Sequence, residues 1–507
     1  MRVTNSMISK NSMTNMNSNK VNVDKLNNQM TSQKKISRPS EDPVIAIRAL
    51  RLRSNLFELD QYVERNIQDA KSWIEVTEGA LINMERIMDD VYKECVAGSN
   101  DPLNQEDRAA ILKNLQSLRS QVYREGNADC IGRYVFTGYK TNKPLTFAED
   151  QADTTYKITE KVSYQDIEEM RYYNNQVTVP NTSADVLAGV DLTDMPKEYT
   201  NKRIRLSYEK MEELTSKDIK FYDEARGRWQ NLEDMEIGDD LVSVTTNMSY
   251  DEWAADDFYV GDKQVIFLKE TGELILGKDV ANAFGSQKTE LSVTYTKKGF
   301  SEGELLPEHY FDCEDITDPD NTIKYTKQNQ EIKYTVAFNQ SLTVNTQASD
   351  VFNSSIGRDV DELTNAVQAA IAAHDKVDKI KEMQKQEQYA DPASQAGLKE
   401  WLEAAEKEAV YADTNMQKLY SKGVDKFQKY KDNITLARTD LGSREDRLLL
   451  TETRVSEQQS TFEQLKTRNE DKELSDIIIE YTAAYTAYQA SLQATSKANG
   501  QTLLNYL

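Results

Sequence analysis

Two histidines, His309 and His374, are candidates for metal or acid–base chemistry. His309 lies in PEHYFDCED (307–315), beside carboxylates and Cys313, which are residue types that bind zinc. The chain contains no HExxH motif, in which two histidines one helical turn apart would hold that metal. We therefore expect His309 in a surface loop of an acidic domain, with a metal cluster as the weaker alternative. We expect His374 to be a packed or half-exposed residue of a helical seam.

The three cysteines, Cys95, Cys130 and Cys313, are odd in number and have no metal-binding spacing. A helix expected over 104–128 would separate Cys95 from Cys130 by roughly 38 Å, too far for a disulfide. We interpret all three as structural thiols. The sequence also lacks a glycine-rich phosphate loop and a nucleophile elbow, so it predicts no enzyme, no cofactor and no metal site.

Composition favours long solvated helices. Only 38% of the 507 residues are apolar, 29% are charged, mean hydropathy is −0.71, and glycine and proline number 19 and 9. A net charge of −23 argues against a nucleic-acid partner. Since no apolar run approaches the ~20 residues of a membrane span, and the N-terminus lacks an apolar signal region, we expect neither membrane insertion nor a cleaved signal peptide.

A heptad pattern begins after the segment ISRPSEDPVIAI (36–47), where Asp42 can cap a helix and Pro43 can take its first position. Between 45 and 91, steps of four and three residues meet an apolar side chain at twelve of fourteen positions, which predicts a coiled-coil seam. AGSNDPLN (97–104) ends this helix, and Asn104 with Asp107 predicts the cap of a second. The residues expected to pack the seam here are Leu52, Leu56, Leu59, Val63 and Trp73.

Residues 148–357 differ in kind, because alternation at period two predicts an inserted, mainly β domain. VIFLKETGELIL (265–276) predicts a hairpin turning at Thr271–Gly272. The repeated IKYT at 323–326 and 332–335 suggests paired strands, and Ile332, Tyr334, Val336 and Phe338 are expected on one face. A short helix is expected at 206–215.

The helical pattern returns at about 358, breaks at YADPASQAG (389–397), and continues to about 470. Residues expected to pack this half are Phe427, Ile434, Leu441 and Phe462. The pattern then changes register over 471–507, where a tyrosine stripe at heptad spacing predicts packing between helices and subunits rather than an aromatic binding platform.

The two ends of the chain have few charged residues and a weak apolar stripe. The charges that residues 1–40 do carry are mostly basic, giving a net charge of about +6. Such helices are unstable alone because tertiary packing supplies most helix stability. We therefore predict that both ends form an assembly interface and order only when neighbours surround them; a merely solvated arm is the alternative for the first 40 residues. The predicted interface residues are Val3, Met7, Met13, Met16, Val23, Ile478, Tyr481, Tyr485, Tyr488, Leu492, Leu503, Leu504 and Leu507.

Several motifs resemble the flagellin superfamily, and most closely its hook–filament junction members. They are ISRPSEDPVIAIRALRLRSNL, DAKSWIEVTEGAL, DRAAILKNLQSLRSQV, GRYVFTGYKTNKPLTF and the final LLNYL, covering about 1–147 and 430–507. Trp73 and the LLNYL ending favour a junction protein over a flagellin. Where the family usually has glycine before its basic pair, this sequence has Gln33, a residue that tolerates positive φ less well.

The resemblance implies an α+β multidomain protein with a long antiparallel coiled-coil rod formed by its N- and C-terminal segments, and an inserted mainly β domain. It assigns 1–42 to an axial-core segment paired with the helix 471–507, 43–147 and 358–470 to the two halves of the rod, and 148–357 to an outer domain.

The function that the resemblance implies is that of a structural adaptor in the bacterial flagellum. Such an adaptor is exported without a cleaved signal through the flagellar channel, and it forms a ring of identical subunits. Its expected partners are a proximal junction protein, flagellin and an export chaperone. Two alternatives remain: a minor flagellin, and a surface-binding module in the insert. The heptads alone would fit a cytoplasmic coiled-coil scaffold equally well, and the family motifs decide against it.

Overall fold

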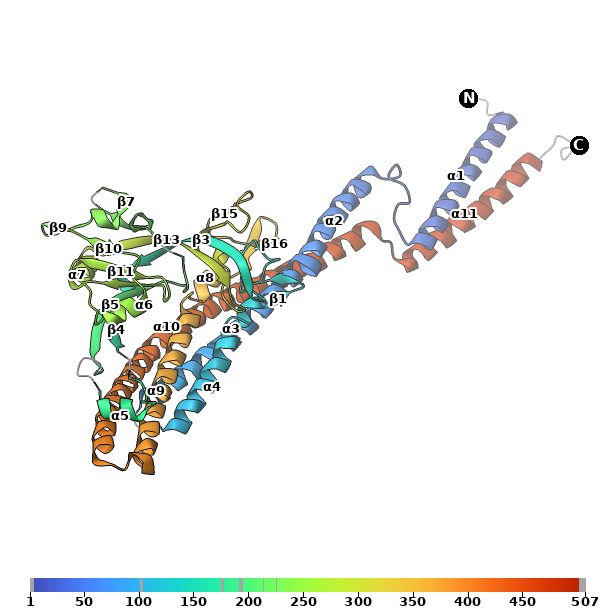
Figure 1. Ribbon diagram of the computed structural model, residues 1–507. Helices are drawn as coiled ribbons and strands as arrows, with labels where there is room; N and C mark the ends of the chain where they lie inside the picture. The colour runs from blue at the N-terminus through green and yellow to red at the C-terminus, as the bar shows by residue number, and fades with distance from the viewer. Residues whose placement is uncertain are drawn as a thin grey trace, which may run out of the picture. The chain divides into compact units, whose positions relative to one another are not determined.

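The computed structural model describes residues 4–100, 104–174, 177–190, 195–212, 214–224 and 226–500 (Figure 1). The chain divides into two compact units. The first comprises residues 1–71, 334–342 and 445–507, and the second comprises 72–333 and 343–444. Each unit is described by itself below.

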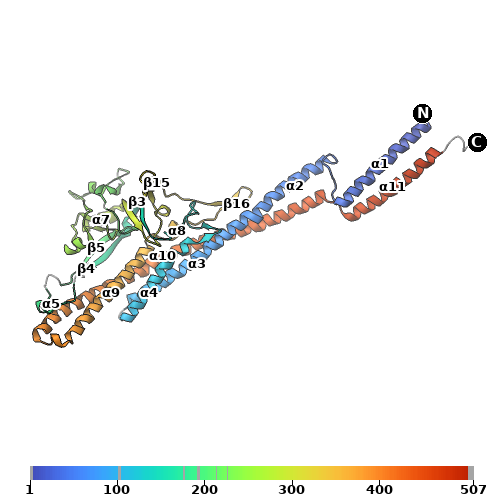
Figure 2. The ribbon, with the colours of Figure 1, turned by 45° about the vertical axis from the view of Figure 1, so that its right-hand side comes forward.

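The first unit is built from long helices. Helix α1 (Asn5–Ser32) lies beside α11 (Leu474–Gly500) in both ribbon views (Figures 1 and 2). Helix α2 (Pro43–Gln61) continues through a π-helical turn, Tyr62–Asn66, into α3 (Ile67–Ser99). As predicted, Asp42 caps α2 by accepting from the backbone N–H groups of Val44 and Ile45.

Helix α2 runs antiparallel to the end of α10 (Pro392–Glu470). The Asn469 amide donates to the Ile45 carbonyl at 3.1 Å, and the Gln459 amide donates to the Asp60 carboxylate at 2.8 Å. Residues later in α2 therefore contact residues earlier in α10. The hairpin of β16 (Lys333–Ala337) and β17 (Gln340–Thr343) also reaches these helices: the Asn66 amide donates to the Thr335 carbonyl at 2.7 Å.

The helices of the second unit are the remainder of α3 and α10 together with α4 (Gln105–Val122) and α9 (Ile356–Gln384). Asn104 and Asp107 form the predicted capping box of α4. Side chains link these helices in pairs: Lys431 to Asp89 at 2.6 Å joins α10 to α3, and Arg119 to Asp361 joins α4 to α9.

Two sheets form the β-rich middle of the chain. The five-stranded sheet has the order β10 (Ser243–Thr245), β11 (Gln264–Leu268), β12 (Glu273–Leu276), β5 (Glu198–Arg205) and β4 (Ile167–Tyr173), with only the β10–β11 pair parallel. The six-stranded antiparallel sheet has the order β15 (Ile323–Tyr325), β14 (Asp312–Asp315), β3 (Gln151–Ser163), β13 (Glu290–Phe300), β6 (Ile219–Asp223) and β7 (Arg228–Asn231).

Smaller elements are the hairpins β1 (Asp129–Cys130)–β2 (Arg133–Tyr134) and β8 (Glu236–Ile237)–β9 (Asp240–Leu241), and the helices α5 (Ser183–Ala188), α6 (Tyr250–Ala255), α7 (Lys278–Gln287) and α8 (Ala348–Val351).

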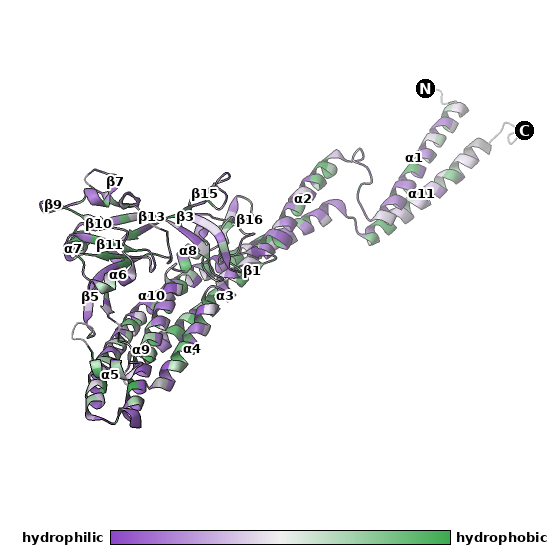
Figure 3. Cartoon of the chain, viewed as in Figure 1, coloured by the Kyte–Doolittle hydropathy of each residue, from purple (hydrophilic) through white to green (hydrophobic). Residues whose placement is uncertain are grey.

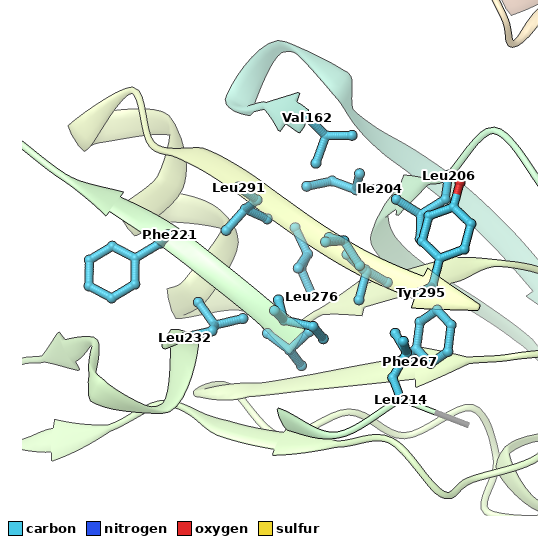
Figure 4. Close-up of a cluster of buried hydrophobic side chains, with 14 of the residues drawn as sticks. Val162, Ile204, Leu206, Leu214, Phe221, Leu232, Phe267, Leu276, Leu291 and Tyr295 are labelled. Atoms are coloured by element: carbon cyan, nitrogen blue, oxygen red, sulfur yellow. The ribbon is translucent and has the colours of Figure 1, made fainter. Parts of the chain in front are cut away.

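One apolar core joins the two sheets. Ile204 and Phe267 from the five-stranded sheet pack in the same cluster as Leu291 and Tyr295 from the six-stranded sheet (Figure 4). All four side chains are buried, as the alternation of apolar residues along these strands requires. The long helices and the β-rich insert confirm the predicted fold class.

A buried ionic network ties the insert to the helices of its own unit. Arg205 on β5 binds Glu362 of α9 at 2.8 Å and also contacts Asp359, which accepts from the Tyr430 hydroxyl at 2.6 Å. Burial opposes the charged form of Glu362, but Arg203 and Arg205 outweigh it and lower the pKa of this carboxyl to about 2. The network therefore stays ionised at neutral pH.

Several details of the insert correct the sequence predictions. The hairpin at Thr271–Gly272 is confirmed, with Leu268 opposite Glu273. The expected helix at 206–215 is wrong: the N–H groups of Lys210 and Met211 donate to carbonyls of the β11–β12 turn instead of to their own helix.

The two IKYT segments do not pair with each other. Tyr325 on β15 lies opposite Cys313 on β14, whereas β16 pairs with β17. The strand face predicted over 332–338 also fails at its end, because Phe338 lies beyond β16 and is 77% exposed while Val336 is buried.

His309 is not in a surface loop. Its side chain is buried, and Nε2 donates to the Pro144 carbonyl at 2.9 Å. The neighbouring Glu308 carboxylate is also buried, where it binds Lys140 and Lys143. Burial lowers the pKa of His309 to about 4.

The turn after α1 has an unusual backbone. Gln33 has φ 54° and ψ 19°, the left-handed conformation that glycine adopts most easily, and its N–H donates to the Gln29 carbonyl. The Gln33 carbonyl in turn accepts from the N–H of Lys472, which fixes this conformation against the start of α11.

We predict that the free energy of unfolding falls on acidification because of His309. With a folded pKa of about 4 and an unfolded value near 6.5, the unfolded chain binds more protons between these values, so stability is fully present above pH 6.5 and declines below it. Between pH 7.5 and 5.5, above the isoelectric point of about 4.8, the loss should be about 1 kcal/mol. Urea unfolding of His309→Gln, whose amide can still donate to Pro144, should lack this component; an unchanged pH slope would contradict the assignment.

We also predict that Gln33→Gly stabilises the turn between α1 and α2. Removing the left-handed strain outweighs the added unfolded-state entropy by about 0.5–1 kcal/mol. Amide exchange of residues 29–36 should slow roughly two- to fivefold. Gln33→Ala, which keeps the strain, is the control, and equal exchange in the two variants would refute this explanation.

Candidate assembly interface

The α1–α11 pair is held together by one narrow stripe on each helix. On α1, Met16 and Val23 are half-buried and Leu26 is 6% exposed, while on α11 Tyr481 and Tyr488 are half-buried. Among the described residues of these two helices, Leu26 and Ile477 are the only fully buried apolar side chains. Serine and asparagine, at Ser9, Ser12 and Asn19, fill other positions of the α1 stripe. The pair therefore has little apolar core.

Other predicted interface residues point away from this stripe. Met7 and Met13 are each 54% exposed, and Ile478, Tyr485 and Leu492 are 41–47% exposed. Ile8, Val21 and Ile479 are further exposed apolar residues on the same helices, which the sequence prediction omitted. Figure 3 shows apolar and polar residues mixed along α1 and α11. The predicted residues Val3, Leu503, Leu504 and Leu507 lie outside the described residues.

Helix α2 carries a second apolar stripe that the sequence analysis missed. Its buried face consists of Ala46, Ala49, Leu52 and Leu56. At 100° per residue, the opposite face carries an exposed set spaced three and seven residues apart. This set comprises Val44, Ile47, Leu50 and Phe57, which are 55–75% exposed.

A charged cluster lies at the end of the α1–α11 pair where α1 ends and α11 begins. Arg53 binds both carboxylate oxygens of Glu470, at 2.8 and 2.6 Å, and Lys34 contacts Asp471 and Glu470. The hydrogen bond from Arg53 lowers the pKa of the Glu470 carboxyl, so the pair is ionised at neutral pH. Backbone hydrogen bonds between Lys35 and Glu470 and between Gln33 and Lys472 join the two connections.

The residues predicted to pack the rod lie along the inner faces of the helices in their respective units. Leu52, Leu56, Trp73, Phe427, Ile434 and Leu441 are buried, and Leu59, Val63 and Phe462 are half-buried.

The described residues offer little chemistry beyond packing. No group of three histidine, cysteine or acidic side chains among them could hold a metal ion, and none of their helices is long and apolar enough to cross a membrane. Burial raises the pKa of the Cys95 and Cys313 thiols to about 12, so both stay protonated. His374 lies half-exposed against Asp413, at 2.8 Å.

Family models match the two ends of the chain. Residues 3–141 match the bacterial flagellin N-terminal helical region, and residues 424–507 match the bacterial flagellin C-terminal helical region. All of the exposed apolar faces described above on α1, α2 and α11 lie within these matches.

Flagellar hook-associated protein 3 of Salmonella typhimurium is 27% identical over 199 residues, which are 39% of this chain and 60% of that protein. The protein of the same name in Escherichia coli is 31% identical over 129 residues, 25% of this chain and 40% of that protein. The matches thus span less than two thirds of either relative. A crystal structure of flagellar hook-associated protein 3 from Legionella pneumophila aligns with 82% of this chain and 97% of its own, at 11% identity and a TM-score of 0.30. The two ends of the chain thus match the helical regions of bacterial flagellins, and the chain is similar to flagellar hook-associated protein 3.

Proposed function

We propose that this chain is a non-enzymatic structural adaptor of the bacterial flagellum, joining the hook-associated zone to the flagellin filament. The observation that carries the proposal is the set of exposed apolar faces on α1, α2 and α11, because these faces fall within the regions that match flagellins. Two relatives are named flagellar hook-associated protein 3, and this name supports a location next to the hook.

The mechanism is coupled folding and assembly. A pair of helices with two fully buried apolar side chains among its described residues gains little from its own packing, and the ordering of some fifty residues costs conformational entropy. Neighbouring subunits that cover Ile478, Tyr485 and Leu492 supply the missing burial. The ordering of α1 and α11 is thereby completed in the polymer.

In this proposal, segments 1–42 and 471–507 form the axial core, 43–147 and 358–470 form the rod, and 148–357 forms the outer domain. The partners are identical subunits in a ring, a proximal hook-associated junction protein and flagellin. An export chaperone accompanies the chain before it leaves unfolded through the flagellar channel.

A minor flagellin is the second candidate, because the family models are those of flagellin itself. Immunogold labelling of isolated flagella separates the two roles. A junction adaptor gives one band at the hook tip, whereas a filament subunit labels the filament along its length.

We predict that replacing the outward face of α11 abolishes attachment of the filament. Ile478→Ser, Tyr485→Ser and Leu492→Ser together remove apolar surface that neighbours would cover, worth roughly 2–3 kcal/mol per interface, or about 30- to 150-fold in affinity. The free energy of unfolding of the free subunit should stay within about 0.5 kcal/mol of the wild-type value, because these three side chains are exposed in it.

The matched control replaces exposed apolar residues of the insert, Leu187→Ser and Tyr259→Ser, which are 56% and 66% exposed. Filament attachment is counted by electron microscopy of cells carrying each variant. Normal attachment in the α11 variant, or equal loss in the control, would contradict the interface assignment.

A further inference from the structure

An apolar groove lies in the first unit, between the connection that follows α1 and the first turns of α2. Its volume is about 200 Å³. The apolar lining residues are Ile36, Pro39, Ile45, Ala46, Ala49 and Leu50. Lys34, Arg38, Arg53 and Glu470 stand around this lining. An apolar floor with a charged rim is the anatomy of a protein-binding pocket.

The groove has room for a small apolar group. A cavity of roughly 150 Å³ accommodates benzene, so about 200 Å³ accommodates one or two leucine side chains. Leu50, at its edge, is 65% exposed, and the groove is continuous through Leu50 with the exposed stripe of α2. The occupant is therefore expected to be apolar and to approach from the solvent side of α2.

The chain contains a segment of this chemistry that lies outside the described residues. Residues 501–507, QTLLNYL, carry three leucines and one tyrosine, and no charge. An uncharged segment suits the apolar floor, and it places no like charge against the basic rim at Lys34 and Arg38.

A subunit's own segment cannot reach its own groove. Glu470, which lines the groove, lies just before Leu474, where α11 begins. The 27 residues of α11 carry the chain about 40 Å from that point. Leu507 is seven residues beyond Gly500 and can return by at most about 25 Å. Only a second copy can bring these leucines to the groove.

We propose that the groove between residues 34–39 and the start of α2 receives Leu503 and Leu504 of a second copy of this chain, joining neighbouring subunits of the ring. The inference rests on the proposed function in that it requires copies of the chain to assemble. It assigns the leucines of the C-terminal region a specific acceptor on a neighbouring copy.

The test is a cysteine cross-link between two full-length variants, Leu50→Cys and Leu504→Cys. The native cysteines Cys95, Cys130 and Cys313 are buried, so they do not compete. The variants are mixed, assembly is induced and followed by sedimentation, and the pellet is oxidised. A dimer containing a 50–504 disulfide, identified by mass spectrometry, is expected. In the control, Phe57→Cys replaces Leu50→Cys: it is 73% exposed on the same helix but about 10 Å further along, and should give at least fivefold less dimer with Leu504→Cys.

Two results would overturn the proposal, and they differ in what else they refute. Assembled material that lacks the 50–504 link, or that links position 57 equally well, refutes the groove as the acceptor while leaving the adaptor function intact. A mixture that never assembles refutes self-assembly and, with it, both the proposed function and this inference.

Discussion

The main physical constraint on this structure is that helices α1 and α11 bury little apolar surface within one chain. Among the described residues, α1 and α11 pack chiefly on each other, and the stripe between them is partly filled by serine, asparagine and threonine. Only Leu26 and Ile477 are fully buried apolar residues among the described part of the pair. Since helices in water are stabilised mainly by packing, a pair with this little core depends on what lies outside it.

The shortage is confined to the ends of the chain. The insert has a two-sheet core built around residues such as Phe267 and Tyr295, and its strand β5 is fixed to α9 by Arg203, Arg205 and Glu362. Replacing one member of such a network would leave a buried charge without its partner, which is costly. This part of the molecule is therefore complete in one subunit, in contrast to the α1–α11 pair.

Sequence periodicity predicted the helices, the capping residues Asp42 and Asn104, and the β11–β12 hairpin, because each depends on residues close in the chain. It failed where distant residues decide the environment. His309 was placed at the surface because its sequence neighbours are acidic, but Pro144, Lys140 and Lys143 enclose it and Glu308. The second stripe of α2 was missed because the heptad analysis selected one apolar face, and only the position of α10 reveals that Ile47 and Phe57 lie on the uncovered side. The hydrogen bond from Lys472 to the Gln33 carbonyl likewise joins residues that are far apart in the sequence.

Hydrogen exchange of α1 and α11, in the dilute monomer and in the assembled state, tests the central claim most directly. If neighbours complete the packing, amides of residues 9–30 and 477–495 exchange within seconds in the monomer and become protected by at least a hundredfold on assembly, while β3 and β13 stay protected throughout. Strong protection of both helices in the monomer, unchanged on assembly, would show that the pair is stable alone and would contradict the account.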